Sequence, residues 1–316
     1  MLGGCRRSRN MTAFPRIGFV GLGNMGGPMC QRLVEAGYPV TVFDLNPTAL
    51  ERLVTIGASA GSSAADCAAQ ADIFLTSLPR PDHVEAVMAG ENGALKSLRP
   101  GSLWIDLTTN RNELVFRLAS EAPKGVKVVD SPVTGAVDGA RNGKLTLFAG
   151  GEQASFDHAA PVLGHLGMVI HCGALGTGNV VKLVTNQLWF IGAAAIGEGF
   201  ATGIANGVEL GTLWRAIRSS VGDSFVAQHD APSIFAGHYD PSFSLDLCLK
   251  DLRLIQELNR NVRAPLPMTT AAEGAFALAA TRYGAQAAEL HVARRIEDDA
   301  GLSMRLEGDW VPPWEQ

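Results

Sequence analysis

The segment Gly21–Gly26, GLGNMG, constrains the fold of this chain more than any other feature. Its three glycines have G-x-G-x-x-G spacing, directly after the apolar run RIGFVG and directly before GGPMCQRLVEAG, which has helical periodicity. In this context the first glycine permits a tight turn, the second admits a pyrophosphate close to the backbone, and the third packs the helix on the strand. The segment therefore predicts a dinucleotide-binding turn formed by Gly21, Leu22, Gly23, Asn24, Met25 and Gly26.

Strand-like and helix-like segments alternate after this turn as far as about residue 173. The helical patterns ALERLVTIGA, PDHVEAVMAG and NELVFRLASEA separate the strand-like runs PVTVFD, DIFLTSLP, SLWIDLTT and KVVDSPVT, and two more strands, KLTLFAGG and GMVIHCG, follow. Parallel neighbouring strands need such crossover helices. The pattern predicts an α/β Rossmann domain with a doubly wound, mostly parallel sheet.

The sequence changes character after residue 176. A long stretch rich in alanine and glycine, GNVVKLVTNQLWFIGAAAIGEGFATGIANGVEL, predicts one long interdomain helix, and LGTLWRAIRSS, LDLCLKDLRLIQELNR and LPMTTAAEGAFALAATRYG predict further helices. We expect a dinucleotide-binding domain over residues 13–176 and an all-α domain over residues 177–316. Residues 1–12 are basic but lack an apolar signal core, and we expect a disordered leader there. Charged and amide residues interrupt the apolar stretch 180–210, which favours a buried helix over a membrane span.

Composition limits the kind of partner. The chain is 47% hydrophobic and 18% charged, and its formal net charge of -5 is spread without a basic stripe that could follow a nucleic acid. The five cysteines form no C-x-x-C pair, and no histidine pairs with another ligand type at metal-binding spacing. We expect a cytoplasmic protein that binds no metal, no nucleic acid and no membrane.

The second strand ends in Asp44, at the distance where an acidic residue accepts hydrogen bonds from an adenosine ribose. Its charge would repel a 2′-phosphate, so the sequence favours NAD, with NADP as the alternative.

Lys182 and Asn186 are the residues that point to chemistry. They are four positions apart in GTGNVVKLVTNQ and so share one face of the expected long helix. Hydride transfer to or from an alcohol needs a group that takes or gives the hydroxyl proton. An unpaired charge among small apolar residues is costly, and such surroundings lower the pKa of a lysine toward working pH. Lys182 is thus the candidate general acid/base, whereas LCLKDLRL by itself leaves Lys250 open between a surface charge and a site residue.

Four stretches in this order, GLGNMGGPM, DSPVTGAVDGARNGKL, GTGNVVKLVTNQ and LKDL, resemble the β-hydroxyacid dehydrogenase family. The resemblance implies NAD(P)-linked interconversion of a β-hydroxy acid with its semialdehyde, and a homodimer or homotetramer formed through the helical domain. It implies that Lys182 is catalytic and assisted by Asn186, and that Lys250 closes over cofactor and substrate. It also implies a substrate-carboxylate site at Thr134, Gly135 and Ala136, and cofactor contacts from Leu78, Pro79, His83 and Thr109.

The chain departs from the family pattern at residues that we expect to line the substrate site. Thr134-Gly135-Ala136 stands where the family usually has Ser-Gly-Gly, in a stretch that we expect to be a glycine-rich loop after a strand. Thr185 replaces a frequent asparagine, and YGAQAAELH lacks the acidic residue often found after its glycine. We therefore expect the reaction to follow the family more closely than the substrate does.

Three other functions remain open. They are a tartronate, succinic semialdehyde or glyoxylate reductase that uses NADPH, an imine reductase-like enzyme, and a dinucleotide-binding protein without turnover. Imine reductases generally lack the lysine and prefer NADP, so Lys182 and Asp44 both count against that alternative. Lys182 also counts against a protein without turnover.

Overall fold

The computed structural model describes residues 14–260, 262–308 and 310, so the predicted leader lies outside the described residues. Its sheet has the order β3-β2-β1-β4-β5-β6-β8-β7, with β9 paired to β8. Neighbours from β3 to β6 are parallel, whereas β8 runs antiparallel to β6 and β7. The strands are β1 (Ile17–Val20), β2 (Val40–Phe43), β3 (Ser59–Ala60), β4 (Ile73–Thr76), β5 (Leu103–Asp106), β6 (Lys127–Asp130), β7 (Val133–Thr134), β8 (Leu145–Gly150) and β9 (Gly167–Gly173).

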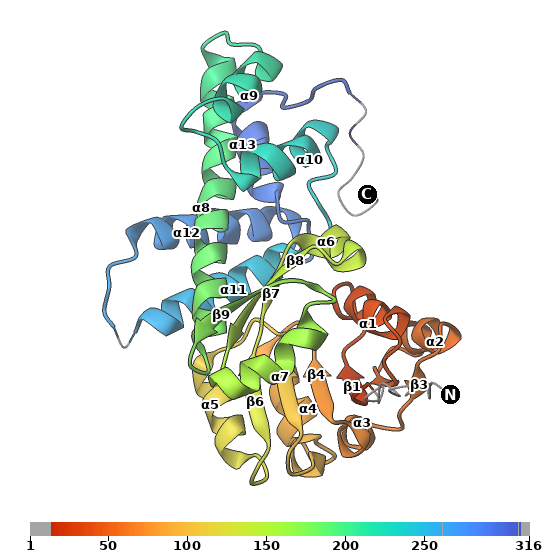
Figure 1. Cartoon of the computed structure of the whole chain (residues 1–316). Coiled ribbons are helices and arrows are strands. Elements are labelled where there is room, and N and C mark those ends of the chain that lie inside the picture. Colours follow the sequence, from red (N-terminus) through yellow and green to blue (C-terminus); the bar gives the residue numbers. More distant parts are fainter. Residues whose placement is uncertain (1–13, 261, 309, 311–316) are drawn as a thin grey trace, which may run out of the picture.

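Helices cover both faces of this sheet (Figure 1). One apolar core contains Phe19 and Ile105 and packs against α1 (Gly26–Glu35), α2 (Pro47–Thr55) and α7 (Gln153–Leu163). A separate core contains Phe74 and Trp104 and packs against α3 (Ala64–Gln70), α4 (Pro81–Ala89), α5 (Asn112–Glu121) and the short 3-10 helix η1 (Leu95–Ser97). The doubly wound, mostly parallel sheet is confirmed, and its order from β3 to β6 is that of a Rossmann domain.

The second half of the described chain is helical. In Figure 1 the long helix α8 runs from the sheet through the whole helical region, which has its own core around Phe190, Phe200 and Phe276. The helices are α8 (Thr177–Ala205), α9 (Leu210–Arg218), the π-helix η2 (Val226–Asp230), α10 (Ala231–Ala236), α11 (Leu245–Asn259), α12 (Pro267–Tyr283) and α13 (His291–Ala300). The predicted long helix and the helical second half are confirmed.

Helix α8 is buried on one face only. By length and composition it could cross a membrane, and only 22% of its most apolar window is buried. Phe190 and Phe200 pack into the helical core, whereas Val184 and Leu188 are exposed. The predicted helix is therefore buried on the face toward the helical core, and the expectation of burial is wrong for its opposite face.

Two local predictions around the predicted carboxylate site are also wrong. KVVDSPVT is not one strand, because the chain breaks at Ser131 and Pro132 between β6 and β7, and a proline cannot donate to the ladder. The stretch after Thr134 is not a loop, since Ala136–Asn142 forms the short helix α6. The sequence patterns also gave no indication of β3, α3, α7, α10 or α13.

Candidate active site

The glycine-rich turn has the geometry that a dinucleotide needs. Gly21 has φ +94°, and a Cβ there would lie 2.2 Å from the carbonyl oxygen of Ser77. A Cβ on Gly26 would lie 1.9 Å from the carbonyl oxygen of Gly21, so helix and turn pack directly on each other. Gly23 is exposed, with open space where its Cβ would be. Among the described residues no side chain caps the start of α1, so this helix end is open to a phosphate, although the N–H of Gly27 already donates to the carbonyl oxygen of Gly23.

Asp44 lies beside this turn at the end of β2. Its Oδ2 accepts a hydrogen bond from the backbone N–H of Leu22 at 2.6 Å, and its Oδ1 accepts one from Asn46 at 2.7 Å. Each carboxylate oxygen has a further lone pair, so the group can also accept from a ribose hydroxyl. Of the other predicted turn residues, Asn24 is exposed and Met25 is half-buried.

The remaining predicted cofactor residues follow strands β4 and β5. The N–H of Leu78 donates to Thr108 Oγ1 at 3.0 Å, which ties the two strand ends together next to the half-buried Thr109. Pro79 is exposed and its carbonyl faces Lys250, as described below. His83 lies on α4 with half of its side chain exposed.

Asn186 contacts the middle of α11, and the charges of this helix act on Lys182. Asn186 Nδ2 donates to Asp251 Oδ2 at 2.7 Å, and Lys250 Nζ lies 2.9 Å from Asp251 Oδ1. Lys250 Nζ also donates to the carbonyl oxygen of Pro79 at 3.0 Å, which bridges the helical region to the end of β4. Lys182 is 8% exposed. The structure thus brings Lys182, Asn186 and Lys250 to one place and adds Asp251, which the sequence patterns do not single out.

The surroundings of Lys182 suit proton transfer near neutral pH. Burial, with a smaller effect of the Lys250 charge, lowers the pKa of its ammonium to about 8, although Asp251 and Glu289 act in the opposite direction. Glu289 belongs to YGAQAAELH, so that stretch supplies an acidic residue after all, five positions beyond its glycine. A general acid/base works best when its pKa is close to the operating pH.

The predicted carboxylate site combines a polar side chain with strained backbone. Thr134 ends β7 and is half-buried, and Gly135 has φ +122°. Ala136 follows with φ +55°, in the left-handed region that glycine adopts without strain. Non-glycine residues in this region are concentrated at functional sites. Strand β8, which pairs with β7, packs against α8 and so connects this segment to the lysine helix.

A buried polar network fixes the start of α8. Asp130 Oδ1 accepts from the N–H of Gly176 at 2.6 Å, and its Oδ2 accepts from the N–H of Asn179 at 2.7 Å. The side chain of Asn179 accepts from the N–H of Asn110, whose own side chain donates to Asp106 at the end of β5. The helix that carries Lys182 is thus hydrogen-bonded to the carboxyl edge of the sheet, where the cofactor of a Rossmann domain binds.

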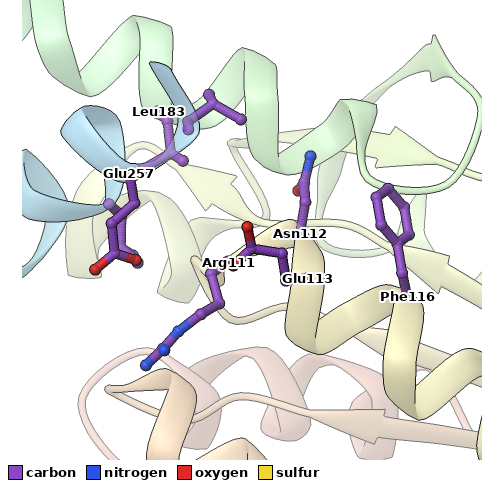
Figure 2. Close-up of a pocket in the computed structure, with 8 residues that line it drawn as sticks. Arg111, Asn112, Glu113, Phe116, Leu183 and Glu257 are labelled. Carbon is purple, nitrogen blue, oxygen red and sulfur yellow. The ribbon is translucent and has the colours of Figure 1, made fainter. Parts of the chain in front are cut away.

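A different pocket, of about 180 Å³, lies between α5, α8 and α11 (Figure 2). Leu183 reaches it from α8, next to Lys182 in sequence but on another face of the helix. Its other lining residues are Arg111, Asn112, Glu113, Phe116, Leu254, Glu257 and Leu258. None of the predicted catalytic, substrate or cofactor residues lines this pocket, so we place the candidate active site at Lys182.

Known proteins resemble the chain over both of its halves. Residues 16–176 match the model of the NAD binding domain of 6-phosphogluconate dehydrogenase, and residues 176–296 match that of the NAD-binding region of NADP-dependent 3-hydroxyisobutyrate dehydrogenase. The 3-hydroxyisobutyrate dehydrogenase of Pseudomonas aeruginosa is 36% identical over 83% of this chain and 91% of that protein. The chain belongs to the β-hydroxyacid dehydrogenase family.

Two further relatives show how the members of this family vary. The NAD-dependent L-serine dehydrogenase of Pseudomonas aeruginosa is 33% identical over 83% of this chain and 91% of that protein. A structure of Mycobacterium tuberculosis 3-hydroxyisobutyrate dehydrogenase with L-serine has a TM-score of 0.82 and 30% identity, and covers 90% of this chain and 99% of that one. This β-hydroxyacid dehydrogenase is therefore an NAD(P)-binding oxidoreductase that acts on a hydroxyl group.

Proposed function

We propose that this β-hydroxyacid dehydrogenase oxidises a small β-hydroxy acid such as 3-hydroxyisobutyrate to its semialdehyde, with NAD as the cofactor. The observation that carries the proposal is Lys182, a buried lysine with a pKa of about 8 beside the Asn186–Asp251 hydrogen bond.

Each group in the site has a role in this reaction. The Thr134 hydroxyl and the N–H groups of the following residues bind the substrate carboxylate. Neutral Lys182 accepts the hydroxyl proton, and Asp251 holds the side chain of Asn186 in place beside it. A dinucleotide held at the Gly21–Gly26 turn would supply the hydride acceptor. In the reverse direction protonated Lys182 donates the proton.

Asp44 supports the choice of NAD. Its carboxylate lies beside the Gly21–Gly26 turn, on the side of the adenosine ribose in a Rossmann domain. A 2′-phosphate would bring negative charge against this carboxylate. An NADPH-linked semialdehyde or glyoxylate reductase would use the same Lys182 and is the second candidate. The buried lysine weighs against an imine reductase-like enzyme and against a protein without turnover.

Two expectations about assembly and location complete the proposal. Exposed apolar residues on α8, Val184 and Leu188, support a homodimer or homotetramer formed through the helical region. The cysteines of the described residues, Cys30, Cys67, Cys172 and Cys248, are all free, which supports the reducing cytoplasm.

A panel assay tests the function. Purified protein is mixed with NAD or NADP and a series of 3-hydroxy acids, and NAD(P)H is followed by its absorbance. The reverse assay uses the matching semialdehydes and glyoxylate. We expect turnover of at least one β-hydroxy acid, with a higher kcat/KM for NAD than for NADP. Turnover only with NADPH and an aldehyde would favour the second candidate, and no turnover with any pair would contradict the proposed function.

A further inference from the structure

Glu289 occupies a fixed position beside the candidate active site. It lies between α12 and α13, and its N–H donates to the carbonyl oxygen of Phe243 at 3.0 Å. The adjacent residues Ala288 and Ser244 form an antiparallel bridge. This pairing holds Glu289 against the segment that leads directly into α11, the helix with Lys250 and Asp251.

The Glu289 carboxyl group is buried without a hydrogen-bond partner at one of its oxygens. The residue is 4% exposed, and Oε2 has no partner among the described residues. A buried polar atom left in this state destabilises a fold, so such an atom needs an explanation. Two nearby acidic side chains do have hydrogen-bond donors. Asp230 accepts from Trp189 Nε1 at 2.8 Å, and Asp240 accepts from the N–H of Ser242 at 3.0 Å. The unpartnered oxygen therefore marks a place where a ligand can donate.

The charges around Glu289 favour a cationic ligand. Burial raises the pKa of Glu289 well above its usual value, and the charges of Asp240 and Asp230 raise it further, whereas Lys182 lowers it. Asp230 is paired with His229, which also interacts with Asp138 on α6. The α11 groups nearby are Cys248, Lys250 and Asp251. A ligand cation would compensate the excess of acidic groups on this wall.

The chemistry of a β-hydroxy acid decides which part of the substrate meets this wall. In the proposed function the C1 carboxylate lies at Thr134–Ala136 and the C3 hydroxyl lies at Lys182. Only the substituent on C2 then lacks a partner. Each of the two groups shifts the pKa of the other, so Glu289 lies near Lys182, and C2 is the carbon next to the one that carries the hydroxyl.

We propose that Glu289 selects β-hydroxy acids that carry an ammonium group on C2. The inference rests on the proposed function and names the substrate class for the same site. It assigns to Glu289 a hydrogen-bonded ion pair with the substrate, which an alkyl substituent cannot form.

Three substrates with the skeleton HOCH₂–CHX–COO⁻ isolate the C2 group. They are serine, glycerate and 3-hydroxyisobutyrate, in which X is ammonium, hydroxyl and methyl, each tested as both enantiomers. Glu289→Gln keeps the shape and removes the charge. We expect this variant to lose about 10- to 100-fold in kcat/KM for serine, the range for a charged hydrogen bond, and less than about threefold for 3-hydroxyisobutyrate. Glu91→Gln, a charge change on an exposed residue, is the matched control.

The outcomes separate this inference from the proposed function. An equal loss for all three acids, or no loss for serine, would overturn the role of Glu289 while turnover itself stands. Oxidation of 3-hydroxyisobutyrate but not serine by the wild type would also overturn it. No oxidation of any β-hydroxy acid would contradict the proposed function and the inference together.

A binding measurement does not depend on turnover. Calorimetric titration of serine into the enzyme–NADH complex, near pH 7 in two buffers of different ionisation enthalpy, reports proton release. We expect the wild type to release more protons than Glu289→Gln, because an ammonium beside Glu289 favours its ionised form. Equal release by both proteins, or none by either, would overturn the inference. A thermal melt checks that the variant is folded.

Discussion

At the residue scale, the proposed reaction makes the pKa of Lys182 set the pH range of activity. Oxidation needs the neutral amine, so kcat/KM for oxidation should rise with pH and level off above about 8. Reduction needs the ammonium and should decline across the same range. The measurement is kcat/KM from about pH 6 to 10 in both directions, since this parameter reports the free enzyme. Parallel pH profiles in the two directions would contradict the assignment.

Ala136 has the backbone conformation of a glycine without being one. Its φ of +55° costs an L-residue about 1–2 kcal/mol, so Ala136→Gly should raise the free energy of unfolding by up to about 1 kcal/mol despite the freer unfolded chain. Ala140→Gly, in the interior of the same helix α6, is the control and should lower it by about 1 kcal/mol. Denaturant unfolding measures both. A loss of stability in Ala136→Gly would show that this backbone is not strained.

At the element scale, Asp130 connects the sheet to α8. Each carboxylate oxygen of Asp130 accepts one backbone N–H, and Asp130→Asn replaces one of these acceptors with an NH₂ donor. The variant should therefore have a free energy of unfolding about 1–3 kcal/mol lower near pH 7. Burial raises the pKa of Asp130 to about 6. The Asp130 carboxyl therefore stabilises the fold most below about pH 4, and this contribution is lost as the pH rises to 6. The difference in free energy of unfolding between the wild type and Asp130→Asn should narrow over the same range.

Kinetics add a second readout for Asp130. Displacement of α8 should lower kcat more than it raises KM for NAD, because Lys182 lies one turn beyond Asn179. Asp157→Asn, which changes an exposed carboxylate on α7, should leave both unchanged. An Asp130→Asn variant with the stability and kcat of the wild type would show that this network does not position the lysine.

The sequence could predict the helices and strands whose apolar residues recur with a clear period. The strands β1, β2, β4 and β5 are apolar runs bounded by helical patterns, and the glycine spacing marked the turn before α1 without ambiguity. The break at Pro132 had a signal, but the apolar residues on both sides favoured one strand. Helix α6 has a glycine, an aspartate and an asparagine in seven residues and a glycine at each end, so its composition resembles a loop.

The candidate site residues stand out in the sequence where chemistry and local pattern coincide. Lys182 is unusual inside an apolar helix, and Asn186 follows at helical spacing. Asp130, Asp251 and Glu289 reach the site from three distant segments, and their roles depend on contacts that a single sequence does not display. The left-handed backbone of Ala136 is likewise a result of tertiary packing and not of residue type.

At the scale of the whole molecule, the exposed face of α8 predicts association of subunits. Leu188 is 67% exposed on a helix with a long apolar stretch, and packing against a second copy would remove this side chain from water. The wild type should have the mass of a dimer or tetramer in light scattering, and Leu188→Asp should shift it toward the monomer. Val54→Asp, on exposed α2, is the control. A monomeric wild type would contradict this prediction.

The central claim is that Lys182 moves the substrate proton, and Lys182→Ala tests it most directly. The loss of a general acid/base should reduce kcat by about 10²–10⁴. Binding of NADH, followed by fluorescence titration, should stay within about twofold, because the turn at Gly21–Gly26 lies in the other domain. A variant that keeps kcat within about tenfold of the wild type would contradict the account.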